Sequence, residues 1–128
     1  MVRYRRNFVA GGMYFFTLTL DDRKSSALVD HVDALRAAVR ATRRSLPFTI
    51  DAIVVLPDHL HIVMTLPSQN VDFSSRLGLI KRRFTTAAAK SGVTIARHRN
   101  GEYALWQRRR IGRETWDKIR GSFGERAG

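Results

Sequence analysis

The sequence has no cysteine among its 128 residues. This absence excludes disulfide bonds, cysteine-ligated zinc, iron–sulfur clusters and thiol nucleophiles. The sequence also has no apolar run near the roughly 18 residues that a membrane-spanning helix needs, and its amino terminus lacks the apolar segment of a secretory signal. Acidic residues are scarce, because 11 Asp and Glu stand against 23 Lys and Arg and leave a net charge of +12. We therefore expect a soluble, cytoplasmic protein that does not associate with a membrane.

The length and the positive charge narrow the class of protein further. Since one domain usually takes ~100 to 200 residues, we expect a single domain, and 44% hydrophobic residues are enough to build its core. A nucleic acid is the first candidate for a partner, because Lys and Arg displace the counterions condensed around phosphates. An anionic membrane surface is the weaker alternative, because it would require a basic amphipathic helix with bulky apolar residues on the opposite side.

The apolar periodicity predicts strand, helix, strand, strand, helix and strand, in that order. The predicted elements are a strand over 13–20, a helix from Leu28 to Leu46 capped by Ser25 or Ser26, strands over 49–56 and 59–66, a helix from Phe73 to Ser91 capped by Asp72, and a short strand over 103–106. Pro57 and Asp58 form a tight turn, so the two strands beside it should pair as a hairpin. This order is typical of an antiparallel sheet with helices on one face, an α+β sandwich.

Two histidines on the third predicted strand, His59 and His61, are candidate metal ligands. Residues two apart on a strand project to the same face, with α-carbons about 6.6 Å apart, whereas Leu60 and Ile62 should face the core. Neutral imidazoles bind Zn²⁺, Cu²⁺ or Ni²⁺, and phosphate oxygens or a carboxamide can complete the shell of Mn²⁺ or Mg²⁺. The alternative is an ordinary pair of solvent-facing strand residues, and the spacing alone does not decide between the two.

Four other residues are considered for a functional role. Two of them have both a functional and a structural interpretation, and the other two are expected to be structural or solvent-facing. Asp58 can orient one of the histidines, or it can simply form the turn after Pro57. His31 is expected to face solvent or to cap the first helix, and His98 to belong to a basic loop. Trp106 can stack on a nucleic-acid base or plug the edge of the sheet.

Basic residues form three clusters that we assign to DNA. The clusters are Arg3, Arg5 and Arg6; Lys81, Arg82 and Arg83; and Arg108, Arg109 and Arg110. We expect the second helix to bring its cluster within reach of a phosphate backbone at the histidines, with Arg76 and Lys90 on the same exposed surface. A metal beside a basic surface suggests phosphodiester chemistry.

Several segments together resemble a known family. They are Tyr4-Arg5-Arg6, Gly11-Gly12-x-Tyr14-Phe15-Phe16-Thr17, Val55-Leu56-Pro57-Asp58-His59-Leu60-His61, Phe73-Ser74-Ser75-Arg76, Ile80-Lys81-Arg82-Arg83-Phe84 and Trp106-Gln107-Arg108-Arg109. In this order, over residues 3 to about 109, the chain resembles the REP-associated tyrosine transposases of the HUH endonuclease superfamily. Each segment is weak alone, but the string Leu-Pro-Asp-His-Leu-His between the upstream Tyr-Phe-Phe-Thr and the downstream Trp-Gln-Arg-Arg is specific.

The resemblance implies a ferredoxin-like sandwich in which His59 and His61 hold a divalent metal, Mg²⁺ or Mn²⁺. The metal would polarise a scissile phosphate in single-stranded DNA at a hairpin. A tyrosine on a late helix would then attack to give a 5′-phosphotyrosine, and an Asn or Gln one turn further on would supply a third ligand. The basic arm and the basic helix would contact the hairpin and its flanking strand.

The chain departs from the family pattern after Arg109. Residues 110–128 contain neither tyrosine nor asparagine, and the tyrosines present, Tyr4, Tyr14 and Tyr103, do not match the family's nucleophile. We therefore divide the chain into a transposase domain over 1–109 and a divergent tail over 110–128, and we find no residue for the catalytic nucleophile. Such an ending looks like a frameshifted or truncated gene copy.

These observations predict a transposase-like domain, a monomer or a homodimer, that binds single-stranded or hairpin DNA with a divalent metal and lacks its nucleophile. By resemblance it is a transposase or single-stranded DNA endonuclease, inactive in strand transfer. Two alternatives stay open. One is a non-catalytic nucleic-acid-binding module without a metal, and the other is a nuclease that uses a metal-activated water in place of tyrosine.

Overall fold

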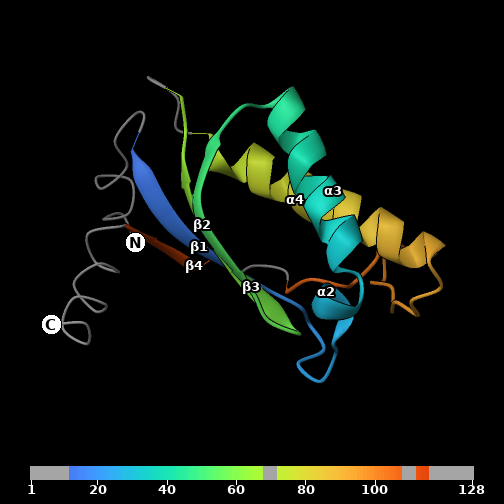
Figure 1. Ribbon diagram of the computed structural model, residues 1–128. Helices are drawn as coiled ribbons and strands as arrows, with labels where there is room; N and C mark the ends of the chain where they lie inside the picture. The colour runs from blue at the N-terminus through green and yellow to red at the C-terminus, as the bar shows by residue number, and fades with distance from the viewer. Residues whose placement is uncertain (1–11, 68–71, 108–111, 116–128) are drawn as a thin grey trace, which may run out of the picture.

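The computed structural model describes residues 12–67, 72–107 and 112–115, the last four as backbone only. Its elements are strands β1 (Met13–Thr19), β2 (Thr49–Val55), β3 (His59–Thr65) and β4 (Gly112–Thr115), and helices α2 (Ala27–Asp30), α3 (Val32–Ser45) and α4 (Phe73–Lys90). The strands form one antiparallel sheet in the order β2-β3-β1-β4. Helices α3 and α4 lie on one face of this sheet (Figure 1). The predicted α+β sandwich with a ferredoxin-like order of elements is confirmed.

On the central strands β1 and β3, successive side chains point alternately to the core and to the opposite face of the sheet. On β3, Leu60, Ile62 and Met64 are buried in the same cluster as Leu77 and Ile80 of α4. The intervening residues of β3 therefore point to the sheet face turned away from the helices, which we call the outer face. The core face predicted for the third strand is confirmed.

Helix α4 forms where the sequence predicts it. The Asp72 carboxylate accepts a hydrogen bond from the Ser75 backbone N–H, which satisfies a donor that the first turn leaves free. The helix ends at Lys90 with Ser91 as its C-cap, and Gly92 follows with a φ of 96°, a conformation that a residue with a β-carbon rarely adopts. Its buried stripe includes Phe73, Leu77, Ile80, Phe84 and Ala88.

The first predicted helix is interrupted. His31, with φ −119° and ψ 40°, ends the single turn of α2 and begins α3, so the apolar spacing from Leu28 onward runs across a break. The Ser25 hydroxyl accepts a hydrogen bond from the Ala27 N–H, whereas the Ser26 hydroxyl donates to Asp30. The apolar residues therefore keep helical spacing across the break at His31, so periodicity alone does not reveal the break.

The last predicted strand, over 103–106, is wrong. Tyr103 and Trp106 form isolated bridges to Arg97 and Leu20, and the strand that pairs with β1 is Gly112–Thr115. Pairing with β1 is decided by which segment reaches that edge of the sheet, and the local sequence does not show this.

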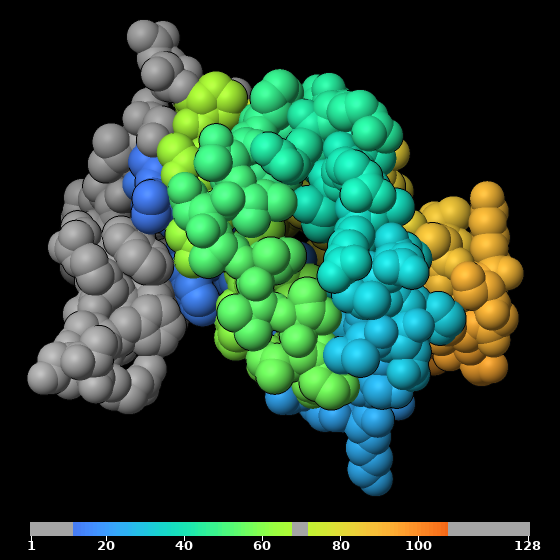
Figure 2. Space-filling view, viewed as in Figure 1, coloured from blue at the N-terminus to red at the C-terminus, as the bar shows by residue number. Residues whose placement is uncertain are grey.

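Strand β2 lies at the other edge of the sheet and is mostly exposed. It pairs with β3 as the predicted hairpin, with a register irregularity between Ile50 and Ala52. A hollow of about 450 Å³ separates β2 from α3 (Figure 2). None of the helices in the described part of the chain has both the length and the apolar character needed to cross a bilayer.

Candidate metal and nucleic-acid site

The two candidate ligands project together from the outer face. The rings of His59 and His61 have centroids 5.0 Å apart and planes at 79° to each other. His59 is the first residue of β3 because the hairpin turn closes there, with the Leu56 N–H donating to the His59 carbonyl at 2.8 Å. Both rings thus leave the same face of the strand, as the two-residue spacing predicts.

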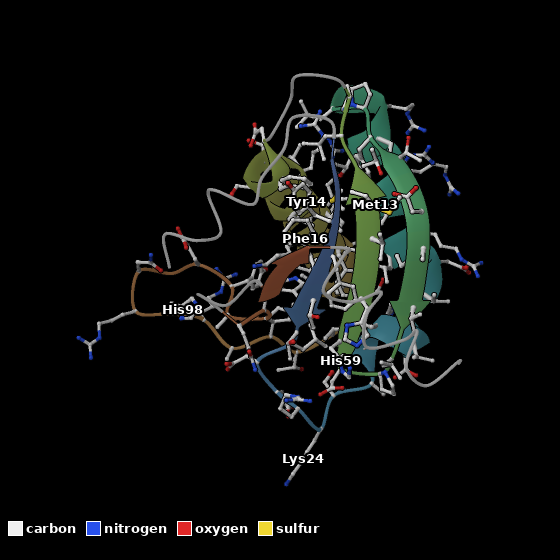
Figure 3. All side chains as sticks on the ribbon, turned by 90° about the vertical axis from the view of Figure 1, so that its left-hand side faces the viewer. Met13, Tyr14, Phe16, Lys24, His59 and His98 are labelled. Carbon is white, nitrogen blue, oxygen red and sulfur yellow. The ribbon has the colours of Figure 1, made fainter. Side chains whose placement is uncertain are left out.

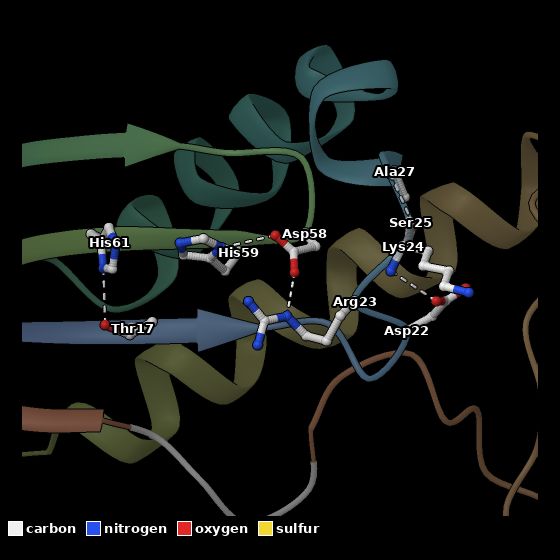
Figure 4. Close-up of polar contacts among 9 residues, drawn as sticks. All are labelled: Thr17, Asp22, Arg23, Lys24, Ser25, Ala27, Asp58, His59 and His61. Atoms are coloured by element: carbon white, nitrogen blue, oxygen red, sulfur yellow. Dashed lines mark hydrogen bonds and ion pairs between the residues drawn. The ribbon is translucent and has the colours of Figure 1, made fainter.

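Asp58 holds one of the rings. Its Oδ1 accepts a hydrogen bond from Nδ1 of His59 at 2.9 Å, and its Oδ2 accepts one from Nε of Arg23 (Figure 4). The hydrogen bond from Arg23, and then that from His59, lower the pKa of the Asp58 carboxyl to about 2. Asp58 is thus a carboxylate at neutral pH that accepts from both neighbours, so the sequence-based alternative in which it only forms the turn is incomplete.

Thr17 holds the other ring. Its Oγ1 lies 2.9 Å from Nδ1 of His61, because Thr17 and His61 occupy opposed positions of β1 and β3. The Phe15 ring stacks on the same imidazole, with centroids 5.3 Å apart. Partial burial, and then the neighbouring His59, lower the pKa of His61, which is therefore neutral at pH 7.

The arrangement leaves one nitrogen of each ring available. The hydrogen bonds of the pair to Thr17 and Asp58 both use Nδ1, and neither Nε2 has a partner among the described residues. Histidine rings that are fixed through Nδ1 and present Nε2 are typical of metal ligands. Within the ranges that the structure describes, no group of three or more His, Cys, Asp or Glu side chains gathers for a metal. His59 and His61 therefore fit two positions of a metal shell whose other ligands must come from elsewhere.

The basic cluster of α4 does not lie beside the histidines. Residues of α4 pack on the helix-bearing face of β3, whereas His59 and His61 point to the outer face, so the expected reach from this cluster to a backbone at the pair is wrong. Lys81 is half-buried, and this burial lowers its pKa; Arg82 is exposed. Arg83 is half-buried.

Arg76 is not a surface residue, contrary to the sequence-based expectation. It is 3% exposed, and its guanidinium donates to the backbone carbonyls of Pro47 and Asp72. It therefore ties the start of α4 to the end of α3. The predicted DNA contacts Arg3, Arg5, Arg6, Arg108 and Arg109 lie outside the described residues, as does Arg110.

A separate groove of about 600 Å³ lies between α4 and the segment over 97–107. Lys81 and Arg82 line one side, and Arg97, His98 and Tyr103 line the other. This segment protrudes beyond the β4 edge of the sheet, with His98 on it, while His59 lies on the sheet itself (Figure 3). The groove brings Lys81, Arg82 and Arg97 together on a different part of the molecule from the histidine pair.

Trp106 is a structural residue rather than a free base-stacking platform. It is 8% exposed, and its indole N–H donates to Thr85 Oγ1 at 3.1 Å. Its ring packs at 69° against Phe84. Of its two sequence-based interpretations, the plug at the edge of the sheet agrees with this environment. His31 is half-buried at the break between α2 and α3 and makes no side-chain capping hydrogen bond.

Neither described tyrosine lies at the histidine pair. Tyr14 is 3% exposed and points into the core, where it meets Phe73 edge-on. Tyr103 lies in the groove-lining segment, with the Arg97 guanidinium 4.1 Å from its ring centre. Tyr4 is outside the described residues.

Sequence reasoning missed Thr17 and Arg23. Thr17 resembles any other outward residue of a strand until the β1–β3 register places it opposite His61. Arg23 lies in a charged turn, and nothing in its local sequence distinguishes it from the neighbouring Lys24. Only the return of the hairpin turn to the end of β1 brings Arg23 against Asp58.

Comparisons with known proteins define the class. No protein-family model matches the chain. Over 111 residues it is 39% identical to a Haemophilus influenzae protein described as a REP-associated tyrosine transposase, covering 85% of this chain and 63% of that protein. Over 93 residues it is 43% identical to the REP-associated tyrosine transposase of Escherichia coli K12, covering 73% of this chain and 56% of that protein. The chain thus spans about three fifths of the length of these curated relatives.

Solved structures agree with these relatives. A REP-associated tyrosine transposase bound to a REP hairpin superposes with a TM-score of 0.73 and 36% identity, covering 95% of this chain and 68% of that one. A Deinococcus radiodurans protein described as a transposase shares the fold, with a TM-score of 0.64, 18% identity, and coverage of 95% and 92%. The fold and the sequence relationships place the chain among the transposases. More narrowly, it belongs to the REP-associated tyrosine transposase family.

Proposed function

We propose that this chain is a DNA-binding domain that holds single-stranded or hairpin DNA of the REP type, with a divalent metal at His59 and His61. The observation that carries the proposal is the pair of imidazoles with Nδ1 engaged by Asp58 and Thr17 and Nε2 available. The net charge of +12 and the family membership support DNA as the partner.

In the proposed site, residues of the protein orient the two histidine rings and keep water away from one of them. The Asp58 carboxylate keeps the proton of His59 on Nδ1, and the Thr17 hydroxyl does the same for His61 when it accepts from that ring. Phe15 covers one side of His61 and limits access of water to it. A divalent metal bound there would supply Lewis-acid polarisation of a phosphate oxygen.

Strand transfer needs a hydroxyl in line with the scissile phosphate, and the described part of the chain provides no such tyrosine. Tyr14 is buried on the opposite side of the sheet from the histidines, and Tyr103 lies along the α4 groove. We propose that the 128-residue chain binds hairpin DNA and forms no phosphotyrosine adduct.

The metal part of the proposal is tested by calorimetry with Mn²⁺ and Ni²⁺. Wild type should bind at micromolar or weaker affinity, because two imidazoles leave the shell incomplete. The His59→Ala, His61→Ala double variant should lose this binding, whereas His31→Ala, at the break between α2 and α3, should keep it. Equal binding by wild type and the double variant would reject the site.

The DNA part is tested with a labelled REP-type hairpin carrying a single-stranded flank, in binding assays and on denaturing gels with Mn²⁺. Binding without an adduct supports the proposal. A shifted, protease-sensitive band would refute the proposal that this chain lacks a nucleophile. Metal-dependent nicking without an adduct would favour a water-using nuclease, and binding that ignores both metal and the histidine variants would favour a non-catalytic module.

A further inference from the structure

Arg23 lies beside the histidine pair, although it belongs to the turn after β1. Its Nε donates to Oδ2 of Asp58, whose other oxygen accepts from His59. Figure 4 shows Arg23 and His59 both joined to Asp58, each at a different carboxylate oxygen. Its side chain is nevertheless 62% exposed, whereas that of Asp58 is 12% exposed.

The guanidinium keeps unused donors at this position. Arginine has five N–H donors in a planar fork, and only Nε of Arg23 has a hydrogen-bond partner among the described residues. In the same part of the chain no other Lys or Arg makes a hydrogen bond or ion pair with Asp58 or with either histidine. Arg23 is therefore the cation that the fold places against this pair.

We propose that Arg23 is the phosphate-binding residue of the histidine site: Nε anchors Asp58, and the two terminal amino groups bind a backbone phosphate of the DNA strand next to His59. The inference rests on the proposed function, because it takes DNA as the bound molecule. Arginine suits this double task because its fork can donate to a carboxylate on one edge and to phosphate oxygens on the other. A lysine ammonium is a point charge without such edges.

Lys24 offers a matched control. It is the next residue, it carries the same charge, and Figure 3 shows its side chain extending away from the molecule, far from the His59 label. Lys24→Gln therefore removes one unit of charge near the site without removing a group that faces it.

The first experiment measures the salt dependence of binding to a labelled single-stranded oligonucleotide. Arg23→Gln should lower the log–log slope by ~0.7, the value for one phosphate contact on a single strand. Arg23→Lys should keep the slope, because it keeps the charge, and Lys24→Gln should change it by much less. Repeating Arg23→Gln in an Asp58→Asn background excludes repulsion by the freed carboxylate as the cause. Equal slope changes for Arg23→Gln and Lys24→Gln would overturn the proposal.

The second experiment uses the DNA-free protein, so that failure of the proposed function and failure of this inference are distinguishable. Inorganic phosphate is titrated into the protein while the NMR signal of the Arg23 Nε–H is followed. A saturable shift of this signal that the Lys24→Gln variant retains supports phosphate binding at Arg23 even if no oligonucleotide binds. An unmoved Arg23 signal, in a protein that binds DNA normally, would overturn the inference and leave the DNA proposal intact.

Discussion

Thr17 and His61 face each other across the centre of the sheet, with 2.9 Å between the Thr17 hydroxyl oxygen and Nδ1 of His61. The same imidazole is stacked on Phe15, so its ring plane and its Nδ1 are both restrained. His59 is restrained in a parallel way by Asp58. The outer face therefore holds two histidines whose orientation is set before any ligand arrives.

The Thr17 contact can be tested by Thr17→Val, which keeps the shape of the side chain and removes the hydroxyl. We expect metal affinity to fall by about 10- to 100-fold, the usual cost of losing a group that orients a ligand histidine. Thr17→Ser keeps the oxygen and should stay near wild type. Calorimetry with Ni²⁺ measures the affinity, and an unchanged value in Thr17→Val would show that the hydroxyl does not orient the ring.

The lowered pKa of His61 predicts a specific pH dependence of stability. Since the folded-state pKa lies below that of the unfolded chain, near 6.5, the unfolded chain takes up this proton first as the pH falls. The free energy of unfolding should therefore decrease below about pH 6.5 until the lowered folded pKa is passed. Urea unfolding of wild type and His61→Gln from pH 8 downward checks this. The variant should show a flatter curve, and parallel curves would contradict the prediction.

Trp106 should matter for stability rather than for stacking on DNA. Trp106→Ala removes a buried ring that packs on Phe84 and should cost about 3 to 5 kcal/mol of unfolding free energy. Tyr103→Ala, at 40% exposure in the same segment, should cost much less. Urea denaturation gives both values. A Trp106→Ala protein of normal stability with impaired DNA binding would restore the base-stacking interpretation.

Arg76 should behave as a core residue despite its charge. Arg76→Met removes the guanidinium hydrogen bonds to the carbonyls of Pro47 and Asp72 and should lower the unfolding free energy by about 2 to 3 kcal/mol. Arg82→Met, on the exposed side of the same helix, should change it by about 0.5 kcal/mol or less. Similar values for the two variants would show that the buried hydrogen bonds of Arg76 add little.

Removing the cap of α4 should also be measurable. Asp72→Ala deletes the acceptor for the Ser75 N–H and should cost about 1 kcal/mol, whereas Asp72→Asn keeps an acceptor and should cost less. The hydrogen bond from Ser75 lowers the pKa of Asp72, so its contribution should be present at neutral pH and be lost as the pH falls through that lowered pKa. Unfolding of Asp72→Ala that costs as much at pH 2.5 as at pH 7 would contradict this.

Much of the fold was predictable because its signals are local. Alternation on the third strand predicted which residues of β3 face α4, and the Asp72 cap and the Ser91-Gly92 ending bounded α4 correctly. The two-residue spacing of His59 and His61 was enough to place both rings on one side of a strand. Such features depend on backbone geometry over a few residues, and a sequence displays them directly.

What remained hidden depends on contacts between distant segments. The register of β1 against β3 is what puts Thr17 opposite His61, and the closure of the hairpin turn on the end of β1 is what puts Arg23 against Asp58. Tertiary packing also buried Arg76, moved the fourth strand to Gly112–Thr115, and put the α4 cations on the other side of the sheet from the histidines. The sequence by itself determined the strand–helix order, the charge and the histidine pair, because these follow from composition and short-range periodicity. Only the tertiary structure decided which side chains surround that pair, because partners 35 and 44 residues apart in the chain are chosen by strand pairing and core packing.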